Sequence, residues 1–268
     1  MTHRFIAGAF FFSKMRKRLM EDFEERINKL KELIEESKRI VFFGGAGVST
    51  DSGIPDFRSK DGLYNQHDVN FERYSPEYLL SHSCLYENTK VFYEFYRQKL
   101  NVDGINPNIT HYKLAELEKK GKLDSVITQN IDGLHQKAGS IKVYEVHGST
   151  LRNYCDHCRK VYPSDFIFNS KEQIPHCTES GCRGIVRPDV TLYEEGLPED
   201  AWEGAINSLN RADLLIIGGT SGVVYPANTL VKKFMGTNIV IVNKQETAFD
   251  RMCTLVFHEG LSDVFSRI

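Results

Sequence analysis

The stretch that decides the fold is Val41–Tyr64, "VFFGGAGVSTDSGIPDFRSKDGLY". An apolar run is followed by Gly45-Ala46-Gly47. Small residues there let backbone amides come close to phosphates, as at the first turn of a nucleotide-binding sheet. The third glycine of G-x-G-x-x-G is replaced by Thr50, and Gly53 and Pro55 follow within about two helical turns. The sequence therefore predicts a nucleotide-binding strand and turn whose helix ends early.

Further apolar segments predict the rest of a sheet. Each is short and rich in β-branched residues: 125–128, 143–146, 213–219, 238–243 and 254–257. Buried runs of this kind, separated by helical patterns, are typical of a parallel sheet covered on both faces. An amphipathic helix is predicted within 21–38, because Phe23, Ile27, Leu30 and Ile34 recur at helical spacing. We therefore expect an α/β protein with a Rossmann-like, doubly wound parallel sheet.

Two regions interrupt this rhythm and predict a second, smaller lobe. Residues 61–104 hold the aromatic segments "SPEYLLS" and "TKVFYEFYRQKL", each opened by a Ser or Thr helix cap, and residues 151–187 hold most cysteines. One domain would cover 21–268, with a large lobe of about 21–60, 105–150 and 188–268 and a small lobe of about 61–104 and 151–187. Residues 1–20 are expected to be an N-terminal extension, either disordered or preceding a true start at Met15 or Met20.

Composition limits the partners. The chain has 268 residues, 41% of them hydrophobic and 26% charged, which is typical of a folded protein with a sizeable core. A net charge of −2 gives no general attraction to nucleic acid or to an anionic membrane, so neither is expected as a partner. No apolar run approaches the ~20 residues of a membrane helix. A cytoplasmic location is favoured over a targeting segment.

Four of the six cysteines form two close pairs: Cys155-x-x-Cys158 and Cys177-x-x-x-x-Cys182. Two such pairs on separate turns can present four thiolates tetrahedrally to zinc. The second pair is wider than usual, so His157 and His176 are possible substitute ligands, and a redox dithiol or four unrelated thiols are the alternatives. Because four protein ligands leave no open position on the metal, we expect one structural zinc ion.

A polar loop, "TQNIDGLHQKAG", follows the predicted strand 125–128. Its residues Gln129, Asn130, Ile131 and Asp132 stand at the carboxyl end of that strand, where ligands bind in open α/β sheets. The polar ones could meet a ribose or a carboxamide. Taken alone, the loop could equally be an ordinary turn built on Asn and Asp.

Later strand ends extend this crevice. His147 follows the strand 143–146, and a histidine there can transfer a proton near neutral pH without a large pKa shift. Three other histidines compete with it as a base: His135, His111 and His67. Two more strand ends offer amides, hydroxyls and polar side chains to phosphate or ribose. These residues are Gly219, Thr220, Ser221, Asn243 and Lys244.

In their order along the chain, these motifs resemble the sirtuin family of NAD-dependent protein lysine deacylases. The resemblance rests on "GAGVSTDSGIPDFR", "TQNIDGLHQKAG", "HGS", a bacterial-type pair of cysteine pairs, "RPDV", "GTS" and "VNK", and covers about residues 25–265. It implies an enzyme that cleaves NAD, transfers the acyl group of acyl-lysine to ADP-ribose and releases nicotinamide. Acyl-lysine proteins or peptides would be its substrates, and a monomer is expected.

The resemblance also implies roles for single residues. His147 would be the general base for a ribose hydroxyl, with Asn130 and Asp132 beside it in catalysis, and residues 54–58 would form a lid over the nicotinamide ribose. The implied cofactor-binding residues are Gly45, Ala46, Gly47, Asp56, Phe57, Arg58, Gln129, Asn130, Ile131, Asp132, Gly219, Thr220, Ser221, Asn243 and Lys244. The substrate peptide would pair as an added strand with a segment that contains Val190, Thr191, Tyr193 and Glu194.

The chain departs from the family's usual pattern at positions near the substrate. Glu194 stands where glycine is usual, Thr191 where an apolar side chain is usual, and Gly222 where leucine usually follows "GTS". The family branch that removes succinyl or malonyl groups carries a Tyr-x-x-Arg pair. Neither Tyr93 nor Tyr96 is followed by arginine at that spacing, so uncharged acyl groups, acetyl or longer aliphatic ones, are expected.

Two other functions stay open on the same sequence. The altered segment "TLYEE" suits an NAD hydrolase or ADP-ribosyltransferase, in which water or a protein side chain replaces the acyl oxygen as nucleophile. A non-catalytic NAD sensor is the third reading, and the presence of His147 argues against it.

Overall fold

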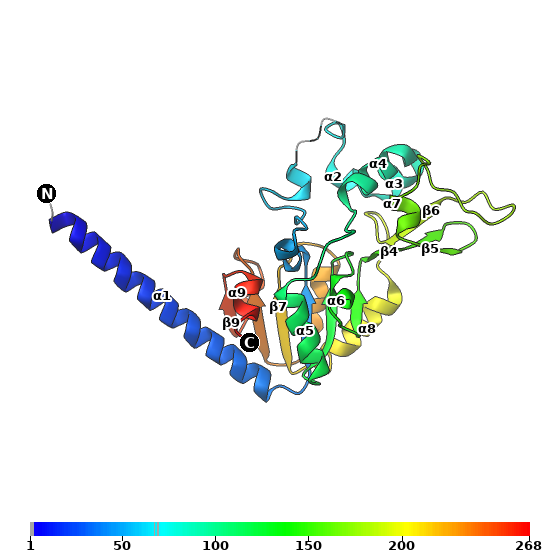
Figure 1. Cartoon of the computed structure of the whole chain (residues 1–268). Coiled ribbons are helices and arrows are strands. Elements are labelled where there is room, and N and C mark those ends of the chain that lie inside the picture. Colours follow the sequence, from blue (N-terminus) through cyan, green and yellow to red (C-terminus); the bar gives the residue numbers. More distant parts are fainter. Residues whose placement is uncertain (1–2, 67, 69) are drawn as a thin grey trace.

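The structure is a computed structural model that describes the backbone of residues 3–66, 68 and 70–268 and the side chains from residue 20 onward, apart from 67 and 69. The expectations for His67 and for the side chains of the extension 1–19 lie outside these described residues. Figure 1 shows a large lobe built on one sheet, with a smaller lobe above it.

The large lobe is built on a parallel sheet in the order β3-β2-β1-β7-β8-β9. Its strands are β1 (Ile40–Gly44), β2 (Leu123–Thr128), β3 (Val143–Glu145), β7 (Leu214–Gly218), β8 (Asn238–Val242) and β9 (Leu255–Phe257). Every neighbouring pair is parallel. The strand order reverses between β1 and β7, and ligands of open α/β sheets bind at such a switch point. The predicted doubly wound sheet is confirmed.

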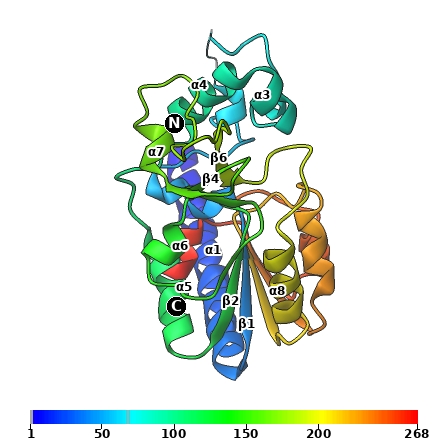
Figure 2. The same cartoon turned by 90° about the vertical axis from the view of Figure 1, so that its right-hand side faces the viewer.

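Helices cover both faces of this sheet, as Figure 2 shows from the side. Because side chains alternate along a strand, Phe42 enters the core on one face while Phe43 enters the core on the other. The first face carries α1 (His3–Glu36), α5 (Ile109–Lys119) and α9 (Leu261–Phe265). The second carries α8 (Glu199–Leu209) and the 3-10 helix η4 (Ala227–Lys233).

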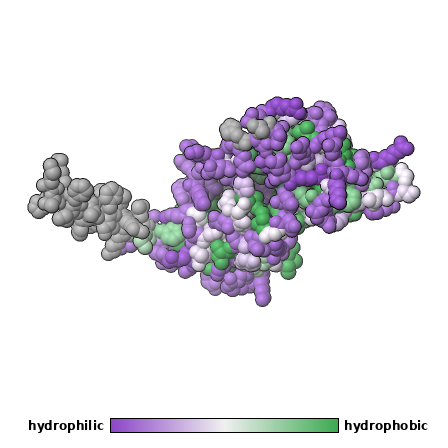
Figure 3. Space-filling model, turned by 45° about the horizontal axis from the view of Figure 1, so that its top comes forward, coloured by the Kyte–Doolittle hydropathy of each residue, from purple (hydrophilic) through white to green (hydrophobic). Residues whose placement is uncertain are grey.

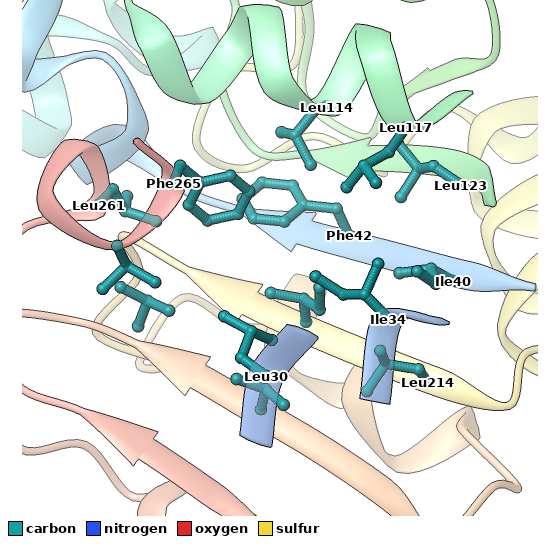
Figure 4. Close-up of a cluster of buried hydrophobic side chains, with 14 of the residues drawn as sticks. Leu30, Ile34, Ile40, Phe42, Leu114, Leu117, Leu123, Leu214, Leu261 and Phe265 are labelled. Carbon is teal, nitrogen blue, oxygen red and sulfur yellow. The ribbon is translucent and has the colours of Figure 1, made fainter. Parts of the chain in front are cut away.

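Figure 4 shows the core of the first face. Leu30 and Ile34 of α1 point into it, as the helical spacing within 21–38 predicts. Phe42 meets Phe265 of α9 edge to face, with ring centroids 5.9 Å apart. This packing fixes the first strand, and with it the turn that follows Gly44.

The small lobe joins helices and a three-stranded antiparallel sheet in the order β5-β4-β6. Its elements are α2 (Pro76–Leu79), α3 (His82–Glu87), α4 (Thr89–Lys99), β4 (Gly148–Cys155), β5 (Val161–Pro163), α7 (Asp165–Phe168) and β6 (Val186–Val190). Ser75 caps α2 as predicted, by accepting from the Tyr78 amide. The cap predicted for α4 is wrong. Asn88, which also ends α3, stands at that position without a side-chain bond, because one helix follows the other directly.

The surface view agrees with the composition. The face in Figure 3 is largely hydrophilic, and its apolar side chains are scattered among polar ones. Among the residues that the structure describes, no helix combines the length and the apolar character needed to span a membrane.

Candidate active site

The turn after β1 ends as early as the sequence predicts. Two single 3-10 turns, η1 (Ala46–Val48) and η2 (Thr50–Ser52), stand where a long crossover helix would begin. Gly53 ends them in the left-handed conformation, with φ 92°, and its amide donates to the Thr50 carbonyl. The chain then turns away into a loop, residues 54–65, which we call the cofactor loop.

The glycines of this turn serve a purpose that the sequence pattern did not predict. The Gly45 amide donates to the Gly218 carbonyl at 3.1 Å, and the Gly47 amide donates to the Gly219 carbonyl at 2.8 Å. A Cβ atom on Gly47 would lie 2.7 Å from the Gly219 Cα. The glycines therefore let the turns after β1 and β7 touch, and their own amides are already used.

Other amides at these two turns stay free for a ligand. Within the described residues, no hydrogen bond engages the backbone amides of Ala46, Thr220 or Ser221. All three residues line the cleft described next. The Ala46 amide is therefore free to meet a phosphate, whereas the glycines of the turn act by close packing.

A cleft of about 770 Å³ lies between the lobes. It is lined by both turns, the cofactor loop, the loop after β2, His147 between β3 and β4, and the segment after β6. The structure brings nearly all candidate residues for cofactor and substrate together here: Gly45, Ala46, Gly47, Asp56, Phe57, Arg58, Gln129, Asn130, Ile131, His147, Val190, Thr191, Tyr193, Glu194, Gly219, Thr220, Ser221, Asn243 and Lys244. Asp132 lies behind the cleft wall.

Asp132 is buried within a hydrogen-bonded group beneath the cleft. Its carboxylate accepts from the Ser49 hydroxyl at 2.6 Å and from the Leu134 amide at 2.9 Å. The Asn130 side-chain amide donates to the same Ser49 hydroxyl at 3.0 Å. Burial raises the pKa of Asp132, and the bonds from Ser49 and Leu134 oppose this rise. Hydrogen bonds through Ser49 therefore link the buried Asp132 to Asn130, which lines the cleft.

His147 lies between β3 and β4, is partly buried and lines the cleft. Its Nδ1 lies 3.0 Å from the Gln129 carbonyl oxygen. Because a carbonyl only accepts, this contact places the proton on Nδ1 and leaves Nε2 as a lone pair in the neutral ring. Burial lowers the pKa of His147, and the positive charge of Arg58 lowers it further, against the effect of the Gln129 bond.

The rival histidines lie elsewhere. His111 and His135 are buried side by side, with ring centroids 4.7 Å apart, and neither lines the cleft. Burial lowers their pKa values to about 4 and about 3. His111 completes a capping box at the start of α5, where its Nδ1 accepts from the Asn108 amide. Both histidines therefore belong to the packing of the large lobe.

The segment after β6, residues 190–195, is called the substrate segment here. Its Thr191 amide donates to the His147 carbonyl at 2.9 Å, which ties the segment to the start of β4. Glu194 adopts the left-handed conformation with φ 75°, which explains why glycine suits this position. The Glu194 carboxylate accepts from both the amide and the hydroxyl of Ser83, at 2.9 and 2.7 Å, in the first turn of α3.

Gly222, the third departure, has a local steric reason. It adopts φ +71°, and a Cβ atom there would lie 2.5 Å from a ring carbon of Phe249. A larger residue would therefore need both a different backbone conformation and a shifted aromatic ring.

The four paired cysteines form one cluster in the small lobe. The sulfur atoms of Cys155, Cys158, Cys177 and Cys182 all lie within 4.8 Å of one another. Backbone amides of His157 and Cys158 point at the Cys155 sulfur, each at 3.4 Å, as suits a thiolate ligand. This donor set fits one tetrahedral zinc ion, and the cysteines alone complete it without His157 or His176.

Comparison with known proteins decides the family. The sequence model of the Sir2 family matches residues 45–226. A protein from Clostridium acetobutylicum named NAD-dependent protein deacetylase is 48% identical over 244 residues, which cover 91% of this chain and 98% of that protein. The chain belongs to the Sir2 family.

Solved Sir2 structures share the fold. One, a Sir2 variant with a deacetylated p53 peptide and 3'-O-acetyl ADP ribose, has a TM-score of 0.81 and 37% identity, covering 90% of this chain and 96% of that chain. Another, bound to a propionylated peptide, has a TM-score of 0.77 and 36% identity, with coverage of 90% and 96%. The Sir2 architecture therefore extends over nearly all of the chain.

Two residues of this Sir2-family site were missed by sequence reasoning. Ser49, only 1% exposed, joins Asn130 to Asp132. A hydroxyl one position before Thr50 in a glycine-rich turn was the available signal. Tyr64 lines the cleft at the end of the cofactor loop. No spacing in the sequence links it to the strand ends.

Proposed function

We propose that this chain is an NAD-dependent protein lysine deacetylase that moves the acyl group of acyl-lysine to ADP-ribose and releases nicotinamide. The observation that carries the proposal is the orientation of His147, whose Nε2 is left as a base in the cleft that also holds the two glycine turns. The relative from Clostridium acetobutylicum and the Sir2 structure with an acetylated ADP ribose support the same activity.

The free amides suggest where NAD would lie. The Ala46, Thr220 and Ser221 amides would hold the pyrophosphate, and Asn243 and Lys244 would meet the adenosine ribose at the end of β8. The cofactor residues named from the sequence would then surround NAD between a large lobe of about 21–60, 105–150 and 188–268 and a small lobe of about 61–104 and 151–187. The domain 21–268 would hold the whole site.

Residues beneath the nicotinamide ribose would supply the chemistry. His147 Nε2 would accept a proton from a ribose hydroxyl once the acyl oxygen has displaced nicotinamide. Asn130, fixed through Ser49 to Asp132, would orient the ribose, while Gln129 and Ile131 would contact the ribose and the carboxamide. Phe57 in the cofactor loop would keep water from the reactive sugar.

We propose acetyl or longer uncharged acyl groups as substrates, presented by a peptide along the substrate segment. Tyr93 and Tyr96 are fully buried, and the Tyr93 hydroxyl donates to the Val186 carbonyl, so neither is free to bind an acyl carboxylate. The Sir2 structure with a propionylated peptide supports an aliphatic chain. Within the substrate segment, the Thr191 carbonyl and the Glu194 amide have no partner in the described structure and could pair with a peptide.

The four cysteines of the cluster, Cys155, Cys158, Cys177 and Cys182, are proposed as the ligands of one structural zinc ion. None of the six cysteines, all of which lie within the described residues, forms a disulfide, which supports a reducing, cytoplasmic setting. We also propose that the chain acts as a monomer. The near-neutral charge supports the absence of nucleic acid from its partners.

The test is mass spectrometry of the products from NAD and an acetyl-lysine peptide, with wild type beside His147→Ala. We expect O-acetyl-ADP-ribose from wild type and a rate about a hundred- to ten-thousand-fold lower from the variant, because general-base catalysis is lost. Bound zinc and the unfolding temperature of the variant should match wild type, which separates a lost base from a lost fold. An undiminished rate in the variant would remove His147 from this role.

The same assay separates the competing functions. Nicotinamide released at an equal rate without peptide would identify an NAD hydrolase, and label transferred from NAD to a protein would identify an ADP-ribosyltransferase. NAD binding with no turnover on a panel of acyl-peptides would identify a sensor. Faster turnover of a succinyl-peptide than of an acetyl-peptide would overturn the proposed acyl preference.

A further inference from the structure

The cofactor loop and the substrate segment touch through three side chains. Arg58 Nη2 donates to the Tyr193 hydroxyl at 3.1 Å, and the Tyr64 hydroxyl lies 3.0 Å from the same oxygen. The Arg58 guanidinium also lies over the Tyr64 ring, 5.6 Å from its centroid. Tyr193 belongs to the substrate segment, whereas Arg58 and Tyr64 belong to the cofactor loop. A single phenolic oxygen therefore joins the two.

Tyr193 is anchored independently on the substrate side. Its amide donates to the Leu80 carbonyl and its carbonyl accepts from the His82 amide, both at 3.0 Å. The neighbouring Glu194 carboxylate holds Ser83 at the start of α3. The backbone of the substrate segment is thus fixed to the helices of the small lobe, and the Tyr193 side chain extends from this support into the cleft.

The cofactor loop is closed by bonds of its own. The Leu63 amide donates to the Asp56 carbonyl at 2.7 Å, and the Tyr64 amide donates to the Phe57 carbonyl at 2.9 Å. The Phe57 and Tyr64 rings meet edge to face, 5.4 Å apart. Tyr64 therefore moves with Phe57, the residue proposed to shield the reactive sugar.

Arg58 depends on the tyrosines for its position. Its side chain is exposed, and among the described residues no carboxylate lies within ion-pair distance of it. Burial and the bond to Tyr193 raise the pKa of Tyr64, so the Tyr64 phenol keeps its proton near neutral pH. With Arg58 donating to Tyr193, the Tyr193 hydroxyl can donate in turn to Tyr64. The hydrogen bonds among Arg58, Tyr64 and Tyr193 form only when the cofactor loop lies against the substrate segment.

We propose that Tyr193 is a positioning residue that couples binding of the acyl-peptide to closure of the cofactor loop over NAD. A peptide lying along the substrate segment would hold the Tyr193 side chain in place, and this side chain would hold Arg58 and Tyr64, which carry the loop. By thermodynamic reciprocity, NAD under a closed loop strengthens peptide binding by the same factor. This inference rests on the proposed function, because it takes NAD and an acyl-peptide as the two ligands.

The test measures this coupling without turnover. Carba-NAD, in which a methylene group replaces the ring oxygen of the nicotinamide ribose, is titrated into the full chain with and without an acetyl-lysine peptide, and the ratio of its two dissociation constants is the coupling. We expect roughly a 5- to 150-fold ratio for wild type, the usual range for coupled sites. In Tyr193→Phe the ratio should approach one, while carba-NAD alone binds within about threefold of wild type.

Two further variants make the result specific. Tyr64→Phe keeps the ring beneath Arg58 and the Arg58–Tyr193 bond, so its ratio should fall between those of wild type and Tyr193→Phe. Tyr112→Phe removes an exposed hydroxyl of α5 for which the described structure shows no partner, and its ratio should equal that of wild type. Unfolding temperature and bound zinc identify any variant that fails to fold.

The outcomes distinguish this inference from the proposed function. A wild-type ratio near one, or an unchanged ratio in folded Tyr193→Phe, overturns the coupling role even if acetyl-peptide is turned over normally. Absence of O-acetyl-ADP-ribose from wild type overturns the proposed function instead. The coupling is supported if the ratio of the two carba-NAD dissociation constants is highest in wild type, lower in Tyr64→Phe and lowest in Tyr193→Phe.

Discussion

At the scale of single residues, the protonation state of His147 depends on two neighbours that are fixed to different degrees. The Gln129 carbonyl belongs to the rigid end of β2, and it sets which ring nitrogen carries the proton. Arg58 belongs to the cofactor loop, and its charge lowers the pKa of His147 beyond the effect of burial. The tautomer is therefore built into the sheet, whereas part of the pKa shift depends on where the loop lies.

This difference gives a prediction on pH. The pKa of His147 is lowered from its ordinary value of 6.5, so the neutral, basic form is present at pH values above a midpoint that itself lies below 6.5. We expect kcat/KM for deacetylation to rise with pH through that midpoint and to be level by pH 7 to 8, roughly where neutral histidine predominates. Steady-state rates measured across pH 5 to 8 would check it.

Arg58→Gln should move the same midpoint upward, because it removes a positive charge that lowers the pKa of His147. The same substitution should also weaken NAD binding. Arg251→Gln removes an exposed positive charge that does not act on His147, and its midpoint should match wild type. A wild-type midpoint above 6.5 would contradict the assignment of the acidic limb to His147.

At the scale of elements, the substrate segment carries Glu194 where the family usually has glycine. This residue strains the backbone of the segment and also ties the segment to α3. Glu194 takes a left-handed backbone conformation that glycine adopts without cost, yet its carboxylate binds the first turn of α3 through Ser83. These bonds also lower the pKa of Glu194. The sequence showed that Glu194 stands where glycine is usual. It did not predict the compensating contact with α3, because that contact depends on the tertiary structure.

Substitutions of Glu194 should therefore show an unusual order. Glu194→Ala keeps the strain and loses the bonds to Ser83, whereas Glu194→Gly loses the bonds and relieves the strain. We expect the glycine variant to unfold at the higher temperature of the two. At Glu203, inside α8 and exposed, the order should reverse, because glycine costs a helix about 1 kcal/mol relative to alanine. Thermal unfolding of the four variants checks both orders, and the same order at both sites would exclude this account of Glu194.

At the scale of the whole molecule, much of the architecture could be predicted from the sequence, for a physical reason. Buried parallel strands are short apolar runs, so β1, β2, β7 and β8 were readable in the order of the chain, and their carboxyl ends had to share one edge. The sequence did not predict contacts between segments that lie far apart in the chain. One example is the pair of hydrogen bonds that the Gly45 and Gly47 amides donate to the turn after β7. The hydroxyl contact of Tyr193 is another such case.

The small lobe gives a prediction at this scale, because its sheet holds the cysteine cluster and one wall of the cleft. Cys155→Ser should reduce bound zinc from about one ion per chain to well below one, since a tetrahedral structural site needs all four ligands. The unfolding temperature and deacetylation should fall together. Cys253→Ser, outside the cluster, should keep its zinc. Elemental analysis with thermal unfolding checks this, and an active variant without zinc would show that the metal does not support the cleft.

The pairing of β1 with β7 has a consequence for how the protein is made. The two strands are permanent neighbours at the centre of the sheet, yet the whole small lobe lies between them in the chain. On the ribosome, β1 emerges with one edge exposed and waits for its partner until most of the polypeptide has been synthesised. The small lobe is complete earlier and can take up its metal first. Nascent chains that end before Leu214 should therefore need protection from chaperones along that open edge.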